Sequence, residues 1–293
     1  MFVATIIAST PEFLGYGDVD EALDRLEVAD CEPGEWDWID HEIAADIPFR
    51  ANFEAAKAAL DNPHMLDAVV QPLGNREKKL LIADMDSTMI TVECIDELAD
   101  YAGIKAEIAE ITERAMRGEL VFEAALRERV ALLECLPESV IEECLAERVK
   151  IMPGARELVR TVRAAGGLTI LVSGGFTRFA EPVAAQIGFE RVRANRLAIA
   201  NGALTGKVEG EIVGAQTKRE TLLTALAEKG WGAEQAIAIG DGANDIPMIE
   251  AAGLGVAYHA KPKTIAAADA AIRHGDLTAI LYAMGLPRSE WVV

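Results

Sequence analysis

The chain has 293 residues, and at about 150 residues per domain this length favours two domains. Half of its residues (51%) are hydrophobic, which is typical of a globular protein with a buried core. The formal net charge of −20 at pH 7 argues against nucleic acid and anionic membrane surfaces as partners, so an anionic ligand would require local cations or a metal.

Cysteine usage and hydropathy bear on the cellular location. The cysteines form no C-x-x-C pair, and no histidine lies near them at zinc-ligand spacing. We therefore expect reduced thiols in a cytoplasmic protein. The apolar run at 1–8 is short and lacks a basic flank, so it predicts a strand and not a signal peptide. No stretch reaches the roughly 20 apolar residues that cross a membrane.

Residues 1–72 predict a small α+β domain of ferredoxin-like order, βαββαβ. The expected elements are a strand at 2–7, a helix at 19–28, strands at 34–40 and 42–47, a helix at 51–61 and a strand at 65–71. A turn-like linker at 71–75 then separates this accessory domain from the rest of the chain.

Residues 78–293 predict an α/β domain with a doubly wound parallel sheet. Short apolar runs at 80–83, 169–172 and 236–239 are typical of strands buried on both faces, and helices are expected at 154–165 and 217–229. Each run ends in a polar or glycine-rich turn. These turns should meet at the carboxyl edge of the sheet, where ligands bind.

Two segments interrupt this alternation. Residues 95–150 are charged and helical in pattern, and they are too long for a crossover, so they predict an inserted helical cap. Residues 190–214 contain Asn201-Gly202 between apolar runs, which predicts a β-hairpin.

The run Asp84-Met85-Asp86-Ser87-Thr88 follows the first buried strand. Two carboxylates at a strand end are costly to bury unless a cation or a proton compensates them. Taken alone, the run also fits an ordinary Asx-turn. It does not fit a calcium-binding EF-hand, because Met89 and Ile95 stand where that loop needs glycine and glutamate.

A second carboxylate pair lies in the run from Gly240 to Asp245, after another buried strand. Together the two pairs supply the oxygen ligands that Mg²⁺ prefers. Ser173-Gly174-Gly175 offers a hydroxyl and backbone N–H groups for an anion, and Lys218 offers a fixed positive charge. The serine lacks the G-x-S-x-G context of a hydrolase elbow.

In this order, D-M-D-S-T, L-V-S-G-G, Lys218 and G-D-G-A-N-D resemble the motifs of the haloacid dehalogenase (HAD) superfamily of phosphohydrolases, from Lys78 to the C-terminus. Within it the chain is similar to the phosphoserine phosphatase family, on Glu93 and on the cap segment 122–130. One departure is Glu134-Cys135, where the family commonly has Lys-Gly. The resemblance implies a Mg²⁺-dependent hydrolase that converts O-phosphoserine to serine and phosphate, the last step of serine biosynthesis.

The resemblance also implies roles for individual residues. Asp84 is the nucleophile and Asp86 moves protons. Mg²⁺ is bound by Asp84, the backbone carbonyl of Asp86 and Asp241, with support from Asp245. The phosphoryl group is contacted by Ser173, Gly174, Lys218 and Asn244. The amino-acid end is bound by Glu93 (ammonium) and Arg129 (carboxylate), beside an apolar wall of Met116 and Phe122. Without the resemblance, Glu93 and Arg129 also fit a charged helix surface.

Other interpretations stay open. A phospho-aspartate can pass its phosphoryl group to an alcohol such as homoserine, and another small phosphomonoester could be the substrate. A phospho-accepting signalling module fits less well, because it lacks a second aspartate two residues after the acceptor and lacks a cap. Members of the family often carry an ACT-like N-terminal module, whose role here could be amino-acid binding, homodimer formation or support of the catalytic domain.

Overall fold

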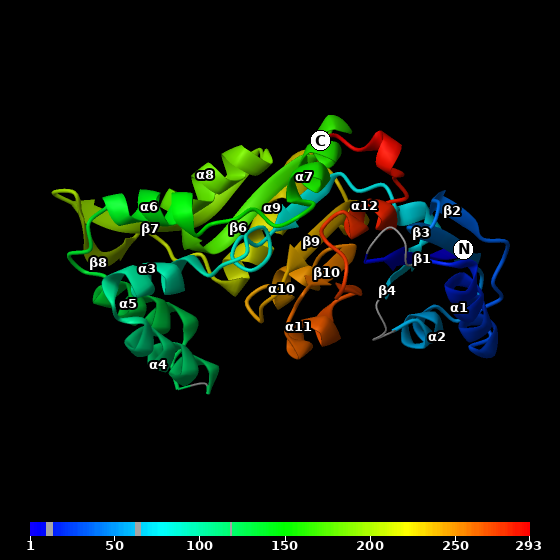
Figure 1. Ribbon diagram of the computed structural model, residues 1–293, viewed down its shortest axis with the longest axis horizontal. Coiled ribbons are helices and arrows are strands. Elements are labelled where there is room, and N and C mark those ends of the chain that lie inside the picture. Colours follow the sequence, from blue (N-terminus) through cyan, green and yellow to red (C-terminus); the bar gives the residue numbers. More distant parts are fainter. Residues whose placement is uncertain (10–13, 62–65, 118) are drawn as a thin grey trace.

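The computed structural model describes residues 1–9, 14–61, 66–117 and 119–293. It contains two β-sheets, one of four strands and one of seven. In Figure 1 the small sheet lies at one end of the molecule, the large sheet at the centre and a group of helices at the other end. No helix in these described ranges is long and apolar enough to cross a membrane.

The four-stranded sheet belongs to the amino-terminal α+β domain. Its elements are β1 (Phe2–Ala8), α1 (Tyr16–Val28), β2 (Asp37–Asp40), β3 (Ala44–Phe49), α2 (Phe53–Ala59) and β4 (Leu66–Pro72). The strand order is β2-β3-β1-β4 and every pair is antiparallel, so the predicted βαββαβ order is confirmed. Residue 65 of the last predicted strand lies outside the described residues.

The predicted boundaries in this domain need small corrections. The predicted strand at 34–40 begins only at Asp37, and the predicted helix at 51–61 begins at Phe53 because Asn52 adopts a left-handed backbone with φ of 55°. The predicted linker at 71–75 is partly wrong. Its first two residues pair with β1 as the end of β4, and the next three form a 3-10 turn, η1 (Leu73–Asn75).

Both faces of this small sheet are covered. Ala4, Ile6 and Ala8 of β1 pack with α1 and α2. Ile7 of β1 and Val69 of β4 point the other way and join the core of the second domain. Because side chains alternate along a strand, one face meets the helices and the other meets the second domain.

The seven-stranded sheet has the order β11-β10-β9-β5-β6-β7-β8, parallel except for β8, and it confirms the predicted doubly wound class. Its strands are β5 (Leu80–Ala83), β6 (Leu168–Phe176), β7 (Arg191–Ala200), β8 (Ala203–Glu209), β9 (Ala236–Gly240), β10 (Leu254–Tyr258) and β11 (Ala270–Ile272). The apolar runs predicted at 80–83, 169–172 and 236–239 all lie in the centre of the sheet.

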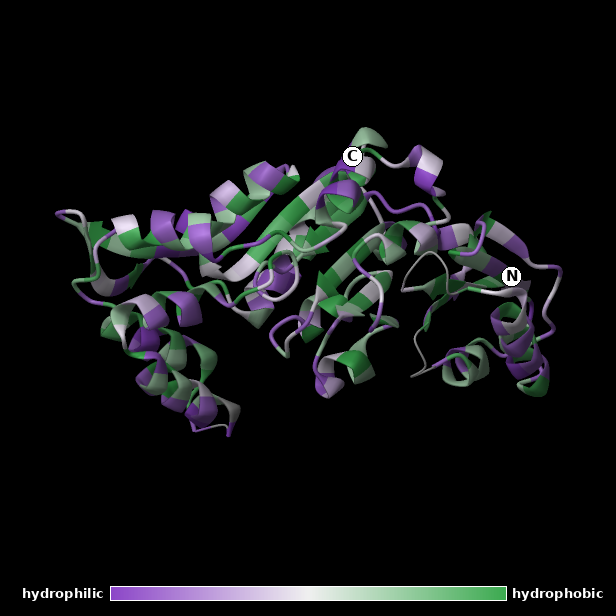
Figure 2. Ribbon diagram, viewed as in Figure 1, coloured by the Kyte–Doolittle hydropathy of each residue, from purple (hydrophilic) through white to green (hydrophobic). Residues whose placement is uncertain are grey.

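Helices cover both faces of this sheet. Leu81 and Ala83 face a layer that includes α7 (Ala155–Ala164), α8 (Thr177–Ile187) and α12 (Ala279–Ala283). Leu80 and Ile82 face α9 (Ala215–Lys229) and α10 (Ile246–Ile249), and the short α11 (Pro262–Ala267) follows β10. Figure 2 shows these outer helices alternating between hydrophobic and hydrophilic residues, as expected of helices that bury one face.

In the described part of 94–147, the predicted cap consists of four helices inserted after β5. They are α3 (Cys94–Ala102), α4 (Lys105–Met116), α5 (Phe122–Leu132) and α6 (Ser139–Glu147). The predicted hairpin is β7–β8, and both residues of its turn, Asn201 and Gly202, have positive φ as that turn requires. The cap rests on this hairpin, since the Cys135 N–H donates to the Leu204 carbonyl at 2.9 Å. Its two connections to the core pair at Ile90 and Ile151.

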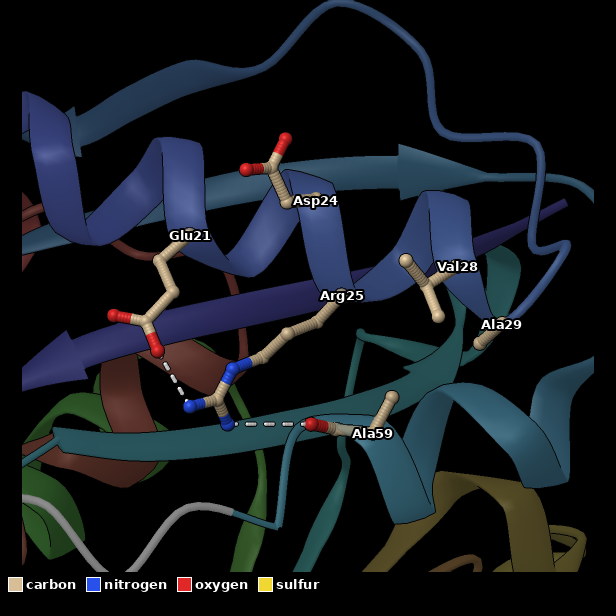
Figure 3. A pocket seen from close by; sticks show the side chains of 6 residues that line it. All are labelled: Glu21, Asp24, Arg25, Val28, Ala29 and Ala59. Carbon is tan, nitrogen blue, oxygen red and sulfur yellow. Dashed lines mark hydrogen bonds and ion pairs between the residues drawn. The ribbon is translucent and has the colours of Figure 1, made fainter.

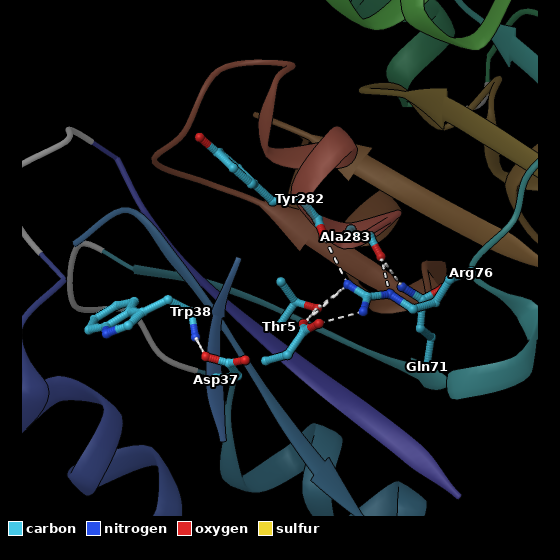
Figure 4. A network of polar contacts seen from close by, with 8 residues as sticks. Thr5, Asp37, Trp38, Gln71, Arg76, Tyr282 and Ala283 are labelled. Carbon is cyan, nitrogen blue, oxygen red and sulfur yellow. Dashed lines mark hydrogen bonds and ion pairs between the residues drawn. The ribbon is translucent and has the colours of Figure 1, made fainter. Parts of the chain in front are cut away.

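Polar contacts join the two domains around Arg76 (Figure 4). Its guanidinium donates to the Asp46 carboxylate and the Thr5 hydroxyl of the small sheet. It also donates to the carbonyls of Tyr282 and Ala283 in α12, at 3.0 and 3.1 Å. One side chain therefore satisfies polar groups of both domains at their junction.

Candidate active site

Asp84 stands directly after β5, at the carboxyl edge of the large sheet. Its N–H donates to the Ile239 carbonyl of β9 at 3.0 Å, which continues the parallel ladder by one residue. Its Oδ1 accepts the Met85 N–H at 2.7 Å, and the residue is only 6% exposed. The backbone then turns sharply, with Ser87 at a φ of 55°. A buried carboxylate is thus held in one orientation.

Lys218 comes from α9 and lies fully buried between two aspartates. Its Nζ is 2.7 Å from Asp84 Oδ1 and 2.7 Å from Asp245 Oδ1. Burial alone lowers the pKa of Lys218, but the Asp245 and Asp84 carboxylates outweigh it and raise the pKa. The lysine is therefore a cation at neutral pH.

Three carboxylates converge at this edge: oxygens of Asp84, Asp241 and Asp245 all lie within 4.8 Å of one another. Burial, then the charge of Asp245, raises the pKa of Asp84 well above its ordinary value, and the same causes raise the pKa of Asp241 to about 6. Lys218 alone does not balance these charges. The cluster therefore fits a divalent cation with oxygen ligands.

Backbone groups fix the aspartates after β9. Both oxygens of Asp245 are bonded, Oδ1 to Lys218 and Oδ2 to the Gly242 N–H at 3.0 Å. The Thr88 hydroxyl donates to Asp241 Oδ1 at 3.3 Å, which ties the two motifs together. Gly240 is required here, because a Cβ would lie 2.3 Å from Cγ of Asp245. Asn244 folds back over the same turn, near Gly242.

Asp86 faces the first helix of the cap. Its Oδ1 accepts the backbone N–H of Cys94, the first residue of α3, at 3.1 Å. Burial and the nearby Glu93 raise the pKa of Asp86 to about 7. Gly175 leaves room for this carboxylate, since a Cβ there would be 2.7 Å from Asp86 Oδ2. A carboxyl group with this pKa can both donate and accept a proton near neutral pH.

The segment Ser173–Gly175 was predicted as a turn, but it belongs to β6, which runs on to Phe176. The register with β7 shifts between Val172 and Phe176, so the expected glycine turn is replaced by an irregularity within the strand. Ser173 is buried, and its hydroxyl accepts the Gly175 N–H at 2.8 Å.

Asn195 was missed by the sequence reasoning. This buried residue of β7 donates from Nδ2 to the Gly174 carbonyl and accepts the Val213 N–H at Oδ1, both at 2.8 Å. It therefore joins the serine–glycine segment to the residues just before α9, which carries Lys218. An asparagine in the middle of a predicted strand was the available signal.

Phe122 and Glu93 lie near this edge, and Arg129 lies close enough to Glu93 for their charges to interact. The Phe122 ring lies over Gly174 and Gly214, 3.3 and 3.4 Å from the positions of added Cβ atoms. Glu93 precedes α3 and accepts the Ser87 hydroxyl at 2.6 Å. Burial lowers the pKa of Arg129, and the charges of Asp96 and Glu93 act in the opposite direction. The side chain of Met116, the last residue of α4, lies outside the described residues.

A separate open groove of about 500 Å³ lies on the amino-terminal domain (Figure 3). It is lined by Glu21, Asp24, Arg25, Val28, Ala29 and Ala59. Arg25 already pairs with Glu21 and donates to the Ala59 carbonyl at 3.4 Å. The groove contains none of the predicted site residues, so the carboxylate cluster is the candidate active site.

Comparison with known proteins identifies the family. Residues 81–250 match the family of haloacid dehalogenase-like hydrolases. The phosphoserine phosphatase of Vibrio cholerae is 47% identical over 202 residues, which are 69% of this chain and 61% of that protein. The phosphoserine phosphatase of Albidiferax ferrireducens is 45% identical over 222 residues, 74% of this chain and 94% of that protein.

Solved structures of phosphoserine phosphatases are similar to this chain in fold. The unliganded crystal structure of a probable phosphoserine phosphatase from Vibrio cholerae has a TM-score of 0.78 at 34% identity and covers 99% of this chain and 87% of its own. A phospho-aspartyl intermediate analogue and a substrate-bound complex of phosphoserine phosphatase each have a TM-score of 0.65 at 40% identity, over 70% of this chain and 98% of theirs. The chain therefore belongs to the phosphoserine phosphatase family of the haloacid dehalogenase-like hydrolases.

Proposed function

We propose that the protein hydrolyses O-phosphoserine to serine and phosphate through a phosphorylated Asp84. The observation that carries this proposal is the position of Glu93, whose charge acts on the pKa of Asp86 and also on the pKa of Arg129 in the cap. Glu93 and Arg129 bear opposite charges. A phosphate, an ammonium and a carboxylate are the three charged groups of phosphoserine, and each then has a complementary partner. The names of the relatives point to the same substrate.

The two oxygens of Asp84 have different surroundings, and this assigns the attacking atom. Oδ1 already interacts with Lys218 and the Met85 N–H. Within the described residues Oδ2 has no hydrogen bond, so it attacks phosphorus in line. The bond from phosphorus to the serine oxygen breaks, its electron pair goes to that oxygen, and protonated Asp86 supplies the proton. A phospho-aspartate and free serine result.

Hydrolysis reverses the role of Asp86. Its carboxylate takes a proton from water as the water oxygen attacks phosphorus, and the bond between phosphorus and Asp84 breaks to release phosphate. A raised pKa near 7 suits a group that is an acid in one step and a base in the next. The Cys94 N–H holds the carboxylate in position throughout.

The acidic cluster is proposed to bind Mg²⁺ through the carboxylates of Asp84 and Asp241 and the backbone carbonyl of Asp86. Asp245 supports this set, because both its oxygens are already held by Lys218 and Gly242. Bound Mg²⁺ supplies positive charge that offsets the negative charge of the phosphoryl oxygens. Ser173, the Gly174 N–H, Lys218 and Asn244 are proposed to contact the phosphoryl group, and Phe122 and Met116 to line the serine side.

We further propose that residues 1–72 and 78–293 form the two domains and that the protein is cytoplasmic. All four cysteines are free, three of them buried, which suits a reducing compartment. Whether the protein forms a homodimer can be measured by light scattering of the full chain.

A substrate panel tests the proposed function. Purified protein with Mg²⁺ is given phosphoserine, phosphothreonine, phosphoethanolamine and simple sugar phosphates, and we expect phosphoserine to have the highest kcat/KM. Homoserine is added in a second series, in which formation of phosphohomoserine would identify a phosphotransferase instead. Equal rates for all phosphomonoesters would mean that Glu93 and Arg129 do not select the substrate.

A further inference from the structure

A buried carboxylate of the amino-terminal domain reaches into the catalytic domain. Asp67 of β4 is only 2% exposed, and no step of the proposed reaction uses it. Its Oδ1 accepts the Arg273 N–H at 2.7 Å, its Oδ2 accepts the Gly275 N–H at 2.7 Å, and the His274 N–H lies 3.3 Å from both. Successive backbone N–H groups form a concave anion site, and here the anion is a side chain of the other domain.

The turn at 273–275 also holds His259, which directly follows β10. The ring Nε2 of His259 lies 2.9 Å from the Gly275 carbonyl, and since a carbonyl only accepts, this nitrogen donates. The backbone N–H of His259 donates to the Ile272 carbonyl at 2.9 Å. His259 also has a φ of 44°, a left-handed conformation that costs a non-glycine residue about 1 kcal/mol. These two bonds hold it there.

The connection continues into the active site. Two residues beyond His259, the Lys261 N–H donates to the backbone carbonyl of Asp241 at 3.1 Å. Asp241 is one of the three clustered carboxylates. Asp67 of one domain is therefore linked through Gly275, His259 and Lys261 to the loop 240–246 of the other domain, here called the Asp241 loop.

The same segment also touches the base of the cap. The Leu277 N–H donates to the Pro153 carbonyl at 3.2 Å. Gly154 approaches so closely that a Cβ would lie 2.6 Å from the Thr278 nitrogen. Just before Pro153, Met152 and Ile151 pair with the chain that leaves the nucleophile motif. The segment 273–278 thus contacts the amino-terminal domain and the cap connection directly, and it reaches the Asp241 loop through His259 and Lys261.

We propose that Asp67 is a positioning residue for the active site: by fixing the 273–275 turn it holds His259 and, through it, the loop that carries Asp241. The amino-terminal domain is then part of what shapes the cation site. The proposal rests on these contacts and not on the identity of the substrate. Only the activity measurement below depends on the proposed phosphatase function.

The test compares the full-length Asp67→Asn and Asp61→Asn variants. Asparagine keeps the shape of Asp67 but turns one acceptor oxygen into an NH₂ group that faces backbone N–H donors. Asp61 is the matched control, because its carboxylate lies 2.6 Å from the Arg273 guanidinium of the same turn but its side chain is 62% exposed. Both variants lose one negative charge from the same domain.

Two quantities are measured, namely hydrogen–deuterium exchange without metal and the Mg²⁺ concentration for half-maximal activity. We expect Asp67→Asn to speed exchange at 240–246 by about threefold or more, as local opening becomes easier. It should also raise the half-maximal Mg²⁺ concentration on the order of tenfold, which is the low end of the effect seen when residues that hold metal ligands are mutated. KM at saturating Mg²⁺ should stay unchanged. Asp61→Asn should change neither quantity.

A second variant, His259→Ala, removes the middle of the link and keeps the domain interface. It should speed exchange at 240–246 while residues 66–71 exchange as in the unmodified protein, and it carries the test if Asp67→Asn does not fold. Unchanged exchange at 240–246 in His259→Ala, or faster exchange confined to the domain interface in Asp67→Asn, would overturn the proposal. If the unmodified protein hydrolyses no phosphomonoester, the proposed function fails and the exchange comparison still decides this inference.

Discussion

Lys218 and Asp84 form an ion pair of 2.7 Å in which the lysine side chain has no exposed surface. A buried charge is stable only when it is paired, and Lys218 is the cation to which two aspartates are bonded. Lys218 therefore stabilises the buried carboxylates before any substrate arrives.

Replacing Lys218 with methionine tests both roles of this residue. We expect the rate to fall on the order of 10³-fold, because a fixed charge beside the phosphoryl group is lost. The free energy of unfolding should also fall by about 3–5 kcal/mol, because the aspartates lose their partner. Urea denaturation and kcat/KM measure the two effects. Lys229→Met, at the exposed end of the same helix, is the control and should change neither.

Replacing Asp84 with asparagine separates catalysis from folding. Turnover should fall by at least about 10³-fold, since the nucleophile is gone. Burial and Asp245 raise the pKa of Asp84, so its charged form destabilises the metal-free protein and a neutral amide relieves that cost. The melting temperature without Mg²⁺ should therefore equal or exceed that of the unmodified protein. Activity near the original level would contradict the assignment of Asp84 as the nucleophile.

Replacing Arg129 with alanine tests carboxylate recognition. Charge-assisted hydrogen bonds contribute about 1.5–3 kcal/mol each, so the loss of the two bonds of a bidentate contact should lower kcat/KM for phosphoserine by at least about 10²-fold. O-phosphoethanolamine keeps the phosphate and the ammonium but lacks the carboxylate, and its kcat/KM should change much less. Arg127→Ala, on the exposed side of the same helix, is the matched control. Equal losses for both substrates would make Arg129 a structural residue.

Lys78 predicts a pH-dependent change in stability. Burial lowers its pKa from 10.5 to about 8, although Asp269 and Glu234 act in the opposite direction. Between these values the unfolded chain binds more protons than the folded chain, so this residue makes stability rise with pH over that range. In Lys78→Met this contribution should disappear. The free energy of unfolding of the unmodified protein should therefore rise relative to that of the variant between pH 8 and 10.5. Urea denaturation across that range measures the difference, and Lys79→Met is the control.

The sequence predicted the positions of those residues that are marked by their immediate sequence neighbours. Asp84 and Asp241 each follow a short apolar run, and parallel strands bring their ends to one edge, so their meeting was predictable. The hairpin at Asn201 was equally predictable, because its turn needs two residues with positive φ.

Long-range polar contacts carry no such signal. The partners of Asn195 lie 21 and 18 residues away in sequence, and those of Asp67 lie more than 200 residues away. The strands β10 and β11 were not predicted individually either. Ser173 was assigned to a turn, because only the pairing of Phe176 with β7 extends the strand past it.

The amino-terminal sheet gives its second face to the catalytic domain, and this has a consequence for how the chain unfolds. Ile7 and Val69 share one continuous core with Ile280 and Leu281 of α12, so neither part keeps its apolar surface covered without the other. Units that share a core lose it together, and the two domains should melt as one cooperative unit. Calorimetry of the metal-free chain should then record a single transition, and removing residues 1–72 should leave a fragment that aggregates.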